Sequence, residues 1–389
     1  MADVELLRLI QITDLHCAKR GVGFDVQARN LFRRVLSRLV VAAPIVKKLA
    51  TGTAGHNPAA WRELRTSIVN HVRTNPPWRD TRLVVTGDLS TWGDDDSILK
   101  ARKLAETIAN DAGLQEPIFI YGNHDVWPGR PGVLGGFPLF ASAADLDVRR
   151  SALRQQHFAG VPWPRHPLVQ VGLPGGRNLV VFAVSTIEHQ TLQNAIASGR
   201  VSADRFWERA PGTDQLTALV GACGATDVGI VLTHHPVHGD GWWAAVNRAA
   251  AGPLPPVQGL PAAHILSNAP DVGATLAGPP QRAHAVLSGH THETFPSVGQ
   301  STGAAPQPPH PPLTGNQVQL TAGTASQLQF GPQPKPHTWQ CLRFYCDQAA
   351  TRLKIERIVF ERQNNLPGFL PVADSNDPQA VADTWELTI

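Results

Sequence analysis

The chain has 389 residues, of which 42% are hydrophobic and 17% are charged. This much apolar material can form a large core, so the composition excludes a globally disordered chain. A net charge of +3 is too small to indicate a nucleic-acid-binding surface by itself, and no run of eighteen apolar residues is present to span a bilayer. The function must therefore be inferred from the motifs along the chain.

The N-terminal segment MADVELLRLIQITDLH lacks the basic region, the continuous apolar region and the cleavage pattern of a signal peptide. Its apolar run is typical of a β-strand. We accordingly expect a cytoplasmic protein. The four cysteines, Cys17, Cys223, Cys341 and Cys346, form no CxxC pair, and we expect them to be buried thiols.

Short runs rich in Val, Ile and Leu alternate along the chain with segments of helical periodicity. Buried strands are predicted at residues 6–13, 82–86, 117–121, 178–185, 229–233 and 284–288. Helices are predicted at residues 26–50, 59–73, 94–112, 142–157 and 213–222. This alternation is typical of an α/β fold.

The C-terminal part has a different pattern. The strand-like runs QVQLTAG, TWQCLRFYC and RLKIERIVFE follow one another without helices between them, which predicts antiparallel pairing at one side of the core. We expect a single domain over residues 1–389, with a helical insertion at about 26–75. A Pro/Gly-rich loop insertion is expected at about 236–283, and the antiparallel strands at about 313–362.

Residue types that bind metals follow five of the predicted strands. They are Asp14 and His16, Asp88, Asn123 and His124, His234 and His235, and His290 and His292. In open α/β sheets, ligands bind beyond the carboxyl ends of the strands, so these side chains are expected to meet in one crevice. In an extended segment residues 290 and 292 point to the same side, so both imidazoles can face the same site.

These motifs resemble those of the calcineurin-like metallophosphoesterase superfamily. They read D-L-H at 14–16, G-D at 87–88, G-N-H-D at 122–125, H-H-P at 234–236 and G-H-T-H at 289–292. The last three are most similar to the bacterial phosphodiesterase-like branch. The resemblance implies an α/β fold of the αββα type, a sandwich of two mixed β-sheets flanked by helices. It also implies a dinuclear metal centre that hydrolyses a P–O bond by attack of a metal-bridging hydroxide.

The resemblance further implies a division of the ligands between two metal ions. Asp14, His16 and His292 would bind the first ion, Asn123, His234 and His290 the second, and Asp88 would bridge them as a catalytic residue. Mixed oxygen and imidazole ligands suit Mn, Fe or Zn better than Ca or Mg. His124 is implied to donate a hydrogen bond to the phosphate or to protonate the leaving oxygen. His235 is the alternative ligand to His234.

The chain departs from the family pattern at one position. Many members read G-D-x-x-D, in which the second Asp orients the catalytic histidine, whereas Thr91 occupies that place here. A threonine can still accept a hydrogen bond, but it would hold the charged form of His124 less strongly. The departure bears on the role of His124 and leaves the predicted metal ligands unchanged.

The motifs favour a metal-dependent phosphodiesterase acting on a small phosphate ester. A nuclease and a phosphomonoesterase or phosphoprotein phosphatase are the alternatives on the same fold, and a non-catalytic scaffold is the alternative from another class. The basic residues at 26–50 could face nucleic acid, although a solvated helix face is the preferred interpretation. Four tryptophans near the site either pack in the core or stack a nucleobase of a nucleotide-like substrate: Trp92, Trp127, Trp242 and Trp243.

Overall fold

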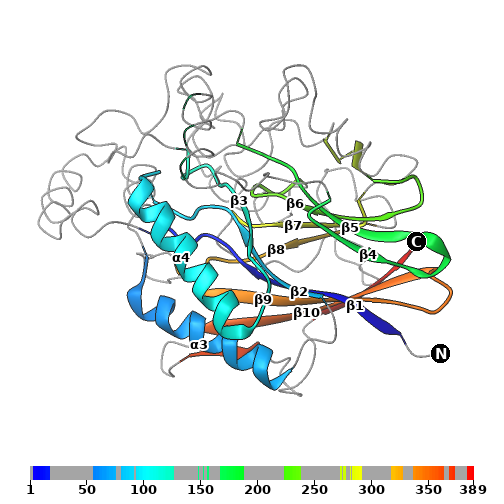
Figure 1. Cartoon of the computed structure of the whole chain (residues 1–389), viewed down its shortest axis with the longest axis horizontal. Coiled ribbons are helices and arrows are strands. Elements are labelled where there is room, and N and C mark those ends of the chain that lie inside the picture. The colour runs from blue at the N-terminus through cyan, green and yellow to red at the C-terminus, as the bar shows by residue number, and fades with distance from the viewer. Residues whose placement is uncertain are drawn as a thin grey trace, which may run out of the picture.

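The computed structural model describes two mixed β-sheets and the helices that pack on them (Figure 1). The described residues are 3–17, 56–75, 80–91, 93–126, 167–187, 223–237, 283–290, 317–326, 336–362, 368–372 and 383–389, with single positions at 148, 152, 156, 272, 273, 275, 276 and 281. Among the helices of these residues, none is long and apolar enough to cross a membrane.

The first sheet combines a parallel half with an antiparallel half. Its strand order is β11 (Phe369–Pro371), β10 (Arg352–Arg362), β9 (Thr338–Cys346), β1 (Val4–Ile12), β2 (Asp80–Thr86) and β3 (Ile118–Ile120), and β12 (Asp383–Thr388) also pairs with β10. β1, β2 and β3 run parallel, whereas β9 is antiparallel to both β1 and β10. The carboxyl ends of β1, β2 and β3 therefore lie at the same edge of the sheet.

The second sheet is parallel except for one edge strand. Its order is β4 (Val169–Gly172), β5 (Asn178–Ala183), β6 (Val228–Leu232), β7 (Ala285–Ser288) and β8 (Val318–Thr321), and the short helix η1 (Pro174–Gly176) connects β4 to β5. Only β4 runs antiparallel to its neighbour. β6, β7 and β8 are buried along their whole length, as expected for strands covered on both faces.

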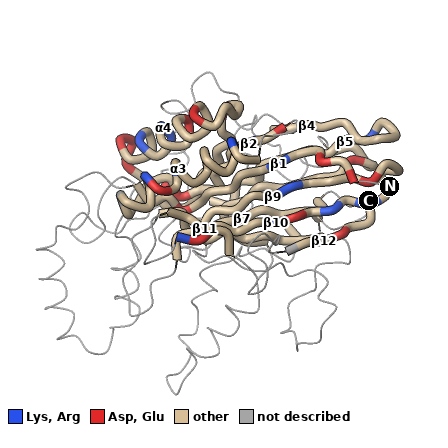
Figure 2. The backbone as a smooth tube through the Cα atoms, turned by 90° about the horizontal axis from the view of Figure 1, so that it is seen from below, with Lys and Arg blue, Asp and Glu red and all other residues tan. Residues whose placement is uncertain are grey.

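Two helices pack side by side against the first sheet (Figure 1). In α3 (Pro58–Thr74), the Asn57 side chain accepts hydrogen bonds from two main-chain N–H groups of the first turn. In α4 (Asp95–Ala112), Asp94 caps the N-terminus and Gly113 ends the helix in the left-handed conformation. Figure 2 shows charged residues on these helices and on strands such as β9 and β10, whereas uncharged residues make up most of the described backbone.

One hydrophobic core joins the two sheets. Alternate residues of the second sheet belong to it, among them Leu179, Ile230 and Leu287, together with residues of β1, β2, α3 and α4. The intervening residues, such as Phe182, Val231 and Val286, form a second cluster with Val272 and Leu276, which are in helical conformation. Because β5, β6 and β7 each contribute residues to both clusters, these central strands of the second sheet are covered on both faces. Two mixed sheets with helices confirm the predicted fold class.

The predicted strands at 6–13, 82–86, 117–121, 178–185, 229–233 and 284–288 are confirmed as β1, β2, β3, β5, β6 and β7. The helices predicted at 59–73 and 94–112 are confirmed as α3 and α4. Of the helix predicted at 142–157, the described positions 148, 152 and 156 are helical. The helices predicted at 26–50 and 213–222 lie outside the described residues, as does the predicted loop at 236–283 apart from a few positions. The division into one domain with insertions stays a prediction.

One prediction for the C-terminal strands was wrong. The run QVQLTAG forms β8, which pairs parallel with β7 in the second sheet, whereas only the other two runs, now β9 and β10, pair antiparallel. A parallel pair needs a crossover of about a dozen residues or more, and the chain between β7 and β8 is long enough to provide it. The lack of a helical pattern between the run QVQLTAG and the run that follows it was therefore a poor indicator of antiparallel pairing.

All four cysteines are buried free thiols, as predicted. Burial raises the pKa of the Cys17 thiol to about 12 and that of Cys341 to about 11. A thiol with a pKa this high carries almost no thiolate at neutral pH, so neither side chain is a reactive nucleophile.

The aromatic pair between β9 and β10 generates a test of the fold. Trp339 is fully buried, stacks on Phe360 with ring centroids 3.8 Å apart, and donates a hydrogen bond from Nε1 to Ser67 of α3. We expect Trp339→Ala to lower the free energy of unfolding by about 3–5 kcal/mol, because it leaves a cavity between the sheet and the helix. Denaturant unfolding measures this change.

Leu99→Ala is the control for this substitution. Leu99 lies on α4 with 56% of its surface exposed, so its truncation should change the free energy of unfolding by less than about 0.5 kcal/mol. Equal effects of the two substitutions would contradict the assignment of Trp339 to the core.

Candidate metal centre

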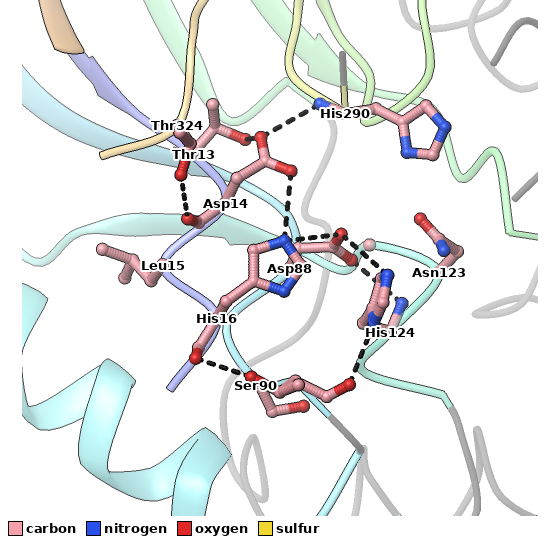
Figure 3. Close-up of polar contacts among 12 residues, drawn as sticks. Thr13, Asp14, Leu15, His16, Asp88, Ser90, Asn123, His124, His290 and Thr324 are labelled. Atoms are coloured by element: carbon pink, nitrogen blue, oxygen red, sulfur yellow. Dashed lines mark hydrogen bonds and ion pairs between the residues drawn. The ribbon is translucent and has the colours of Figure 1, made fainter. Parts of the chain in front are cut away.

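The predicted ligands converge at the carboxyl ends of five strands that come from both sheets. Asp14 and His16 follow β1, Asp88 follows β2, Asn123 follows β3, and His234 and His290 follow β6 and β7. Figure 3 shows several of these side chains pointing toward one another. All of them are buried. The described strand-end side chains thus meet at one place, where the two sheets come together.

Left-handed backbone turns aim the side chains toward this meeting point. Asp14, His16, Asp88 and His290 have φ angles of 52°, 47°, 52° and 70°. Such angles are uncommon for residues other than glycine, and each costs on the order of 1–3 kcal/mol unless the surroundings enforce it. Backbone strain of this kind at four residues beyond three strand ends is typical of a functional site.

Two glycines allow the strand ends to approach one another closely. A Cβ atom at Gly122 would collide with the main chain and carboxylate of Asp88. A Cβ atom at Gly87, where φ is +101°, would lie 2.9 Å from the Cα of Gly122 and would collide with the His234 ring. The Gly-Asp and Gly-Asn-His-Asp motifs therefore need glycine because the two loops touch at these positions.

Asp88 lies between two groups of donors. Its Oδ2 atom is 3.5 Å from Nε2 of His16 and 3.9 Å from Nε2 of His124. Its Oδ1 atom is 3.5 Å from Nε2 of His234 and accepts a hydrogen bond from the main-chain N–H of His124. The two oxygens of one carboxylate thus face different histidine rings.

The remaining donors extend these two groups. Oδ1 of Asp14 lies 3.6 Å from Nε2 of His16. On the other side, Nε2 of His234 lies 3.0 Å from Oδ1 of Asn123 and 3.2 Å from Nδ1 of His290. Oxygen and imidazole donors therefore accumulate on both sides of Asp88.

Hydrogen bonds from the surrounding backbone fix the orientation of the rings. Nδ1 of His234 lies 2.8 Å from the Thr86 carbonyl oxygen, so Nδ1 carries a proton and Nε2 is left to act as the donor atom toward a cation. Oδ2 of Asp14 accepts hydrogen bonds from the Thr13 hydroxyl and from the main-chain N–H of His290. The other Asp14 oxygen is thereby turned toward His16.

The electrostatic environment keeps Asp88 ionised. Burial opposes its charge, but the imidazoles of His234, His124 and His16 outweigh this effect and hold its pKa well below the ordinary value. For His234, burial favours the neutral ring, yet the adjacent Asp88 carboxylate raises its pKa to about 9. Burial and repulsion from Asp88 raise the pKa of Asp125 to about 6. The charge of Asp88 thus dominates the site.

The donors present fit divalent metal ions. Ligand atoms within 4.8 Å of one another form three buried groups: His16, Asp88 and His124; Asp14, Asp88 and His234; and His234, His235 and His290. Carboxylate oxygens mixed with imidazole nitrogens suit transition metals such as Mn, Fe and Zn. Asp88 and His234 each belong to two of these groups.

Six of the seven predicted ligands are brought together, and the seventh, His292, lies outside the described residues. His235 also lies at the site, with its ring 4.2 Å from that of His290. Nδ1 of His235 lies 2.8 Å from the Thr186 hydroxyl oxygen, whereas His234 is in contact with Asp88 and Asn123. Trp92, Trp127, Trp242 and Trp243 lie outside the described residues.

The sequence analysis missed Thr186. Its hydroxyl accepts a hydrogen bond from the main-chain N–H of His235 in addition to its contact with the ring. Thr186 follows β5 by three residues, so the same rule that found the other strand-end residues could have found it.

The structure shows which group of Thr91 orients His124 at the position where many family members have an aspartate. Nδ1 of His124 lies 2.9 Å from the main-chain carbonyl oxygen of Thr91, while the Thr91 hydroxyl donates to the carbonyl oxygen of His16. The orienting group for His124 is therefore the backbone of residue 91 and not its side chain.

Comparison with known proteins agrees with this site. The sequence model of the family described as calcineurin-like phosphoesterase matches residues 7–294, well over half of the chain, and this range contains all the motifs named above. No curated protein matches the chain significantly. Membership of the bacterial phosphodiesterase-like branch stays a prediction. The chain belongs to the calcineurin-like phosphoesterase family.

Proposed function

We propose that the protein is a dinuclear metal-dependent phosphoesterase that acts preferentially on small phosphodiesters. The observation that carries this proposal is the position of Asp88, whose two oxygens face two separate groups of donors. Bound Mn, Fe or Zn ions would supply positive charge toward the phosphoryl oxygens and a water-derived nucleophile at neutral pH.

The proposed roles follow the two sides of Asp88. Asp14 and His16, joined by His292 on the resemblance to the family, hold one ion. Asn123, His234 and His290 hold the other, and Asp88 bridges the two. Only two of these seven side chains carry negative charge, so the loaded site keeps the positive charge that attracts an anionic ester. Contacts of His234 with Asp88 and Asn123 favour it over His235 as the ligand.

His124 is the proposed acid for the leaving group. Its Nδ1–H group donates to the Thr91 carbonyl oxygen, so Nε2 is the ring atom directed toward Asp88 and the reacting group. The imidazolium form can donate the Nε2 proton to the oxygen that leaves phosphorus. Of the candidate site residues, His124 is also the most exposed, at 9%.

Preference for diesters over monoesters rests on two features. The compact G-N-H-D and H-H-P motifs resemble those of phosphodiesterases, and a neutral carbonyl group at position 91 replaces the carboxylate that protein phosphatases place beside the catalytic histidine. The ratio of the kcat/KM values for bis-p-nitrophenyl phosphate and p-nitrophenyl phosphate tests this preference directly.

Asp88→Asn tests the bridging role. Loss of the negative charge should remove metal from the site and lower the hydrolysis of bis-p-nitrophenyl phosphate by on the order of 10³-fold or more in the presence of Mn²⁺. Metal content by elemental analysis and steady-state kinetics are the two measurements.

Asp111→Asn makes the same chemical change on the surface of α4 and is the control. Asp111 pairs there with Arg65 at an exposed position, so both metal content and activity should stay at the wild-type level. Full activity of Asp88→Asn, or no turnover by the wild-type protein with Mn, Fe or Zn, would refute the proposal.

His124→Gln tests the acid role through the leaving group. Metal content should be unchanged, whereas kcat for a diester with an alkoxide leaving group should fall by roughly 10²–10⁴-fold. The decrease should be much smaller for p-nitrophenolate, which leaves without protonation. An equal decrease for both leaving groups would rule out proton donation by His124.

A further inference from the structure

The loop that follows β1 has an unusual hydrogen-bonding arrangement. Left-handed angles at Asp14 and His16 remove this loop from the regular β-ladder. Its N–H groups still bond to the loop after β2: those of Asp14, His16 and Cys17 donate to the carbonyl oxygens of Gly87, Asp88 and Leu89. The carbonyl oxygen of Cys17 accepts from the main-chain N–H of Thr91 in that same loop, whereas those of Asp14, Leu15 and His16 accept from side chains, because buried carbonyl groups need partners.

Three successive carbonyl oxygens of this loop each accept a hydrogen bond from a side-chain hydroxyl. The Thr324 hydroxyl donates to Asp14 O at 2.8 Å, and Figure 3 shows Thr324 beside Asp14. The Ser326 hydroxyl donates to Leu15 O at 2.6 Å, and the Thr91 hydroxyl donates to His16 O at 2.7 Å. We call Thr91, Thr324 and Ser326 the hydroxyl clasp.

The clasp residues after β8 are themselves fixed from several directions. Ser326 accepts a hydrogen bond from Nε1 of Trp61 in α3, so its single hydroxyl proton is committed to Leu15. The carbonyl oxygen of Ser326 accepts from Asn57, and that of Thr324 accepts from Thr338 at the start of β9. The segment is therefore anchored to a helix and to the first sheet before it reaches the loop.

These contacts have a physical consequence for metal binding. A left-handed turn at a residue with a Cβ atom is strained, and the Asp14 and Asp88 carboxylates repel each other when no cation lies between them. If the loop could relax, it would lose its strained conformation and separate the two carboxylates in the absence of metal. Metal binding would then have to restore the strained conformation, at a cost in binding free energy. Contacts that hold the loop in its strained conformation before metal binds reduce this cost and therefore increase the affinity for metal.

We propose that the hydroxyl clasp positions Asp14 and His16 for metal binding, so that Thr324 and Ser326 are functional parts of the metal centre. Both residues lie beyond residue 294, where the match to the family ends. The inference rests on the proposed function, because it takes Asp14 and His16 to be metal ligands. Thr91, Thr324 and Ser326 are positioning residues, since they contact the loop backbone and not the reacting atoms.

Thr324→Val and Ser326→Ala test the proposal, because each removes one hydroxyl with little change in shape. The expected result is a loss of about tenfold in Mn²⁺ affinity for each variant, which is the effect of one hydrogen bond of typical strength. Affinity is measured on the metal-free protein by competition with a fluorescent chelator, without substrate. Circular dichroism identifies the folded protein.

Two further variants make the test specific. Thr324→Ser keeps the hydroxyl and should restore affinity to within about twofold of the wild type. Thr321→Val removes a buried hydroxyl from the end of β8 that contacts Ser288 instead of the loop, so the Mn²⁺ affinity should not change. If a variant at 324 or 326 does not fold, Thr91→Val provides the same test from the opposite side and keeps the carbonyl group that orients His124.

Wild-type affinity in Thr324→Val and Ser326→Ala, combined with a lower unfolding temperature of the metal-free protein, would overturn the proposal and leave the clasp a purely structural role. The proposed function fails in a different way: a wild-type protein that binds no Mn²⁺, Fe²⁺ or Zn²⁺ contradicts it before any variant is compared. A protein that binds metal equally well with and without the clasp contradicts the inference alone.

Discussion

The carboxylate of Asp88 is fully buried, and a buried negative charge is stable only when cations or polar donors surround it. The main-chain N–H of His124 donates to it, and the imidazole rings of His16, His124 and His234 lie around it. These groups come from the ends of β1, β3 and β6. The need to compensate one charge therefore explains why loops far apart in the sequence meet at a single point.

The two sheets must be held in register for this meeting to occur, and a buried polar network performs that task below the site. The side-chain amide of Gln11 in β1 donates to the Thr86 hydroxyl in β2 and to the Ser288 carbonyl oxygen in β7. Gln340 in β9 donates in turn to Gln11. Apolar packing alone would allow the sheets to slide, whereas these directional bonds specify one relative position.

The strand cores and the convergence of the described strand-end residues were predictable because each leaves a local signal. Apolar runs such as that of β6 indicate a buried strand. Asp88 and Asn123 each come shortly after such a run, which places them at the carboxyl edge of the sheet, where ligands bind in α/β folds. The hydroxyls of Thr324 and Ser326 leave no such signal, because serine and threonine are common in loops and their partners are distant in sequence. The pairing of β8 with β7 was also missed. It depends on the path of a long connection between the two strands, which leaves no local signal in the sequence.

Thr91 shows how the family departure and the loop geometry depend on each other. Its backbone orients His124, and its hydroxyl donates to the carbonyl oxygen of His16. An ionised aspartate at this position has no proton to donate, so it would place an acceptor against the acceptor that the hydroxyl now satisfies. Compared with an aspartate, Thr91 offers His124 no charged partner, but its hydroxyl donates a hydrogen bond to the loop that follows β1. In this chain, the same residue therefore connects the orientation of the proposed acid to the positioning of the proposed metal ligands.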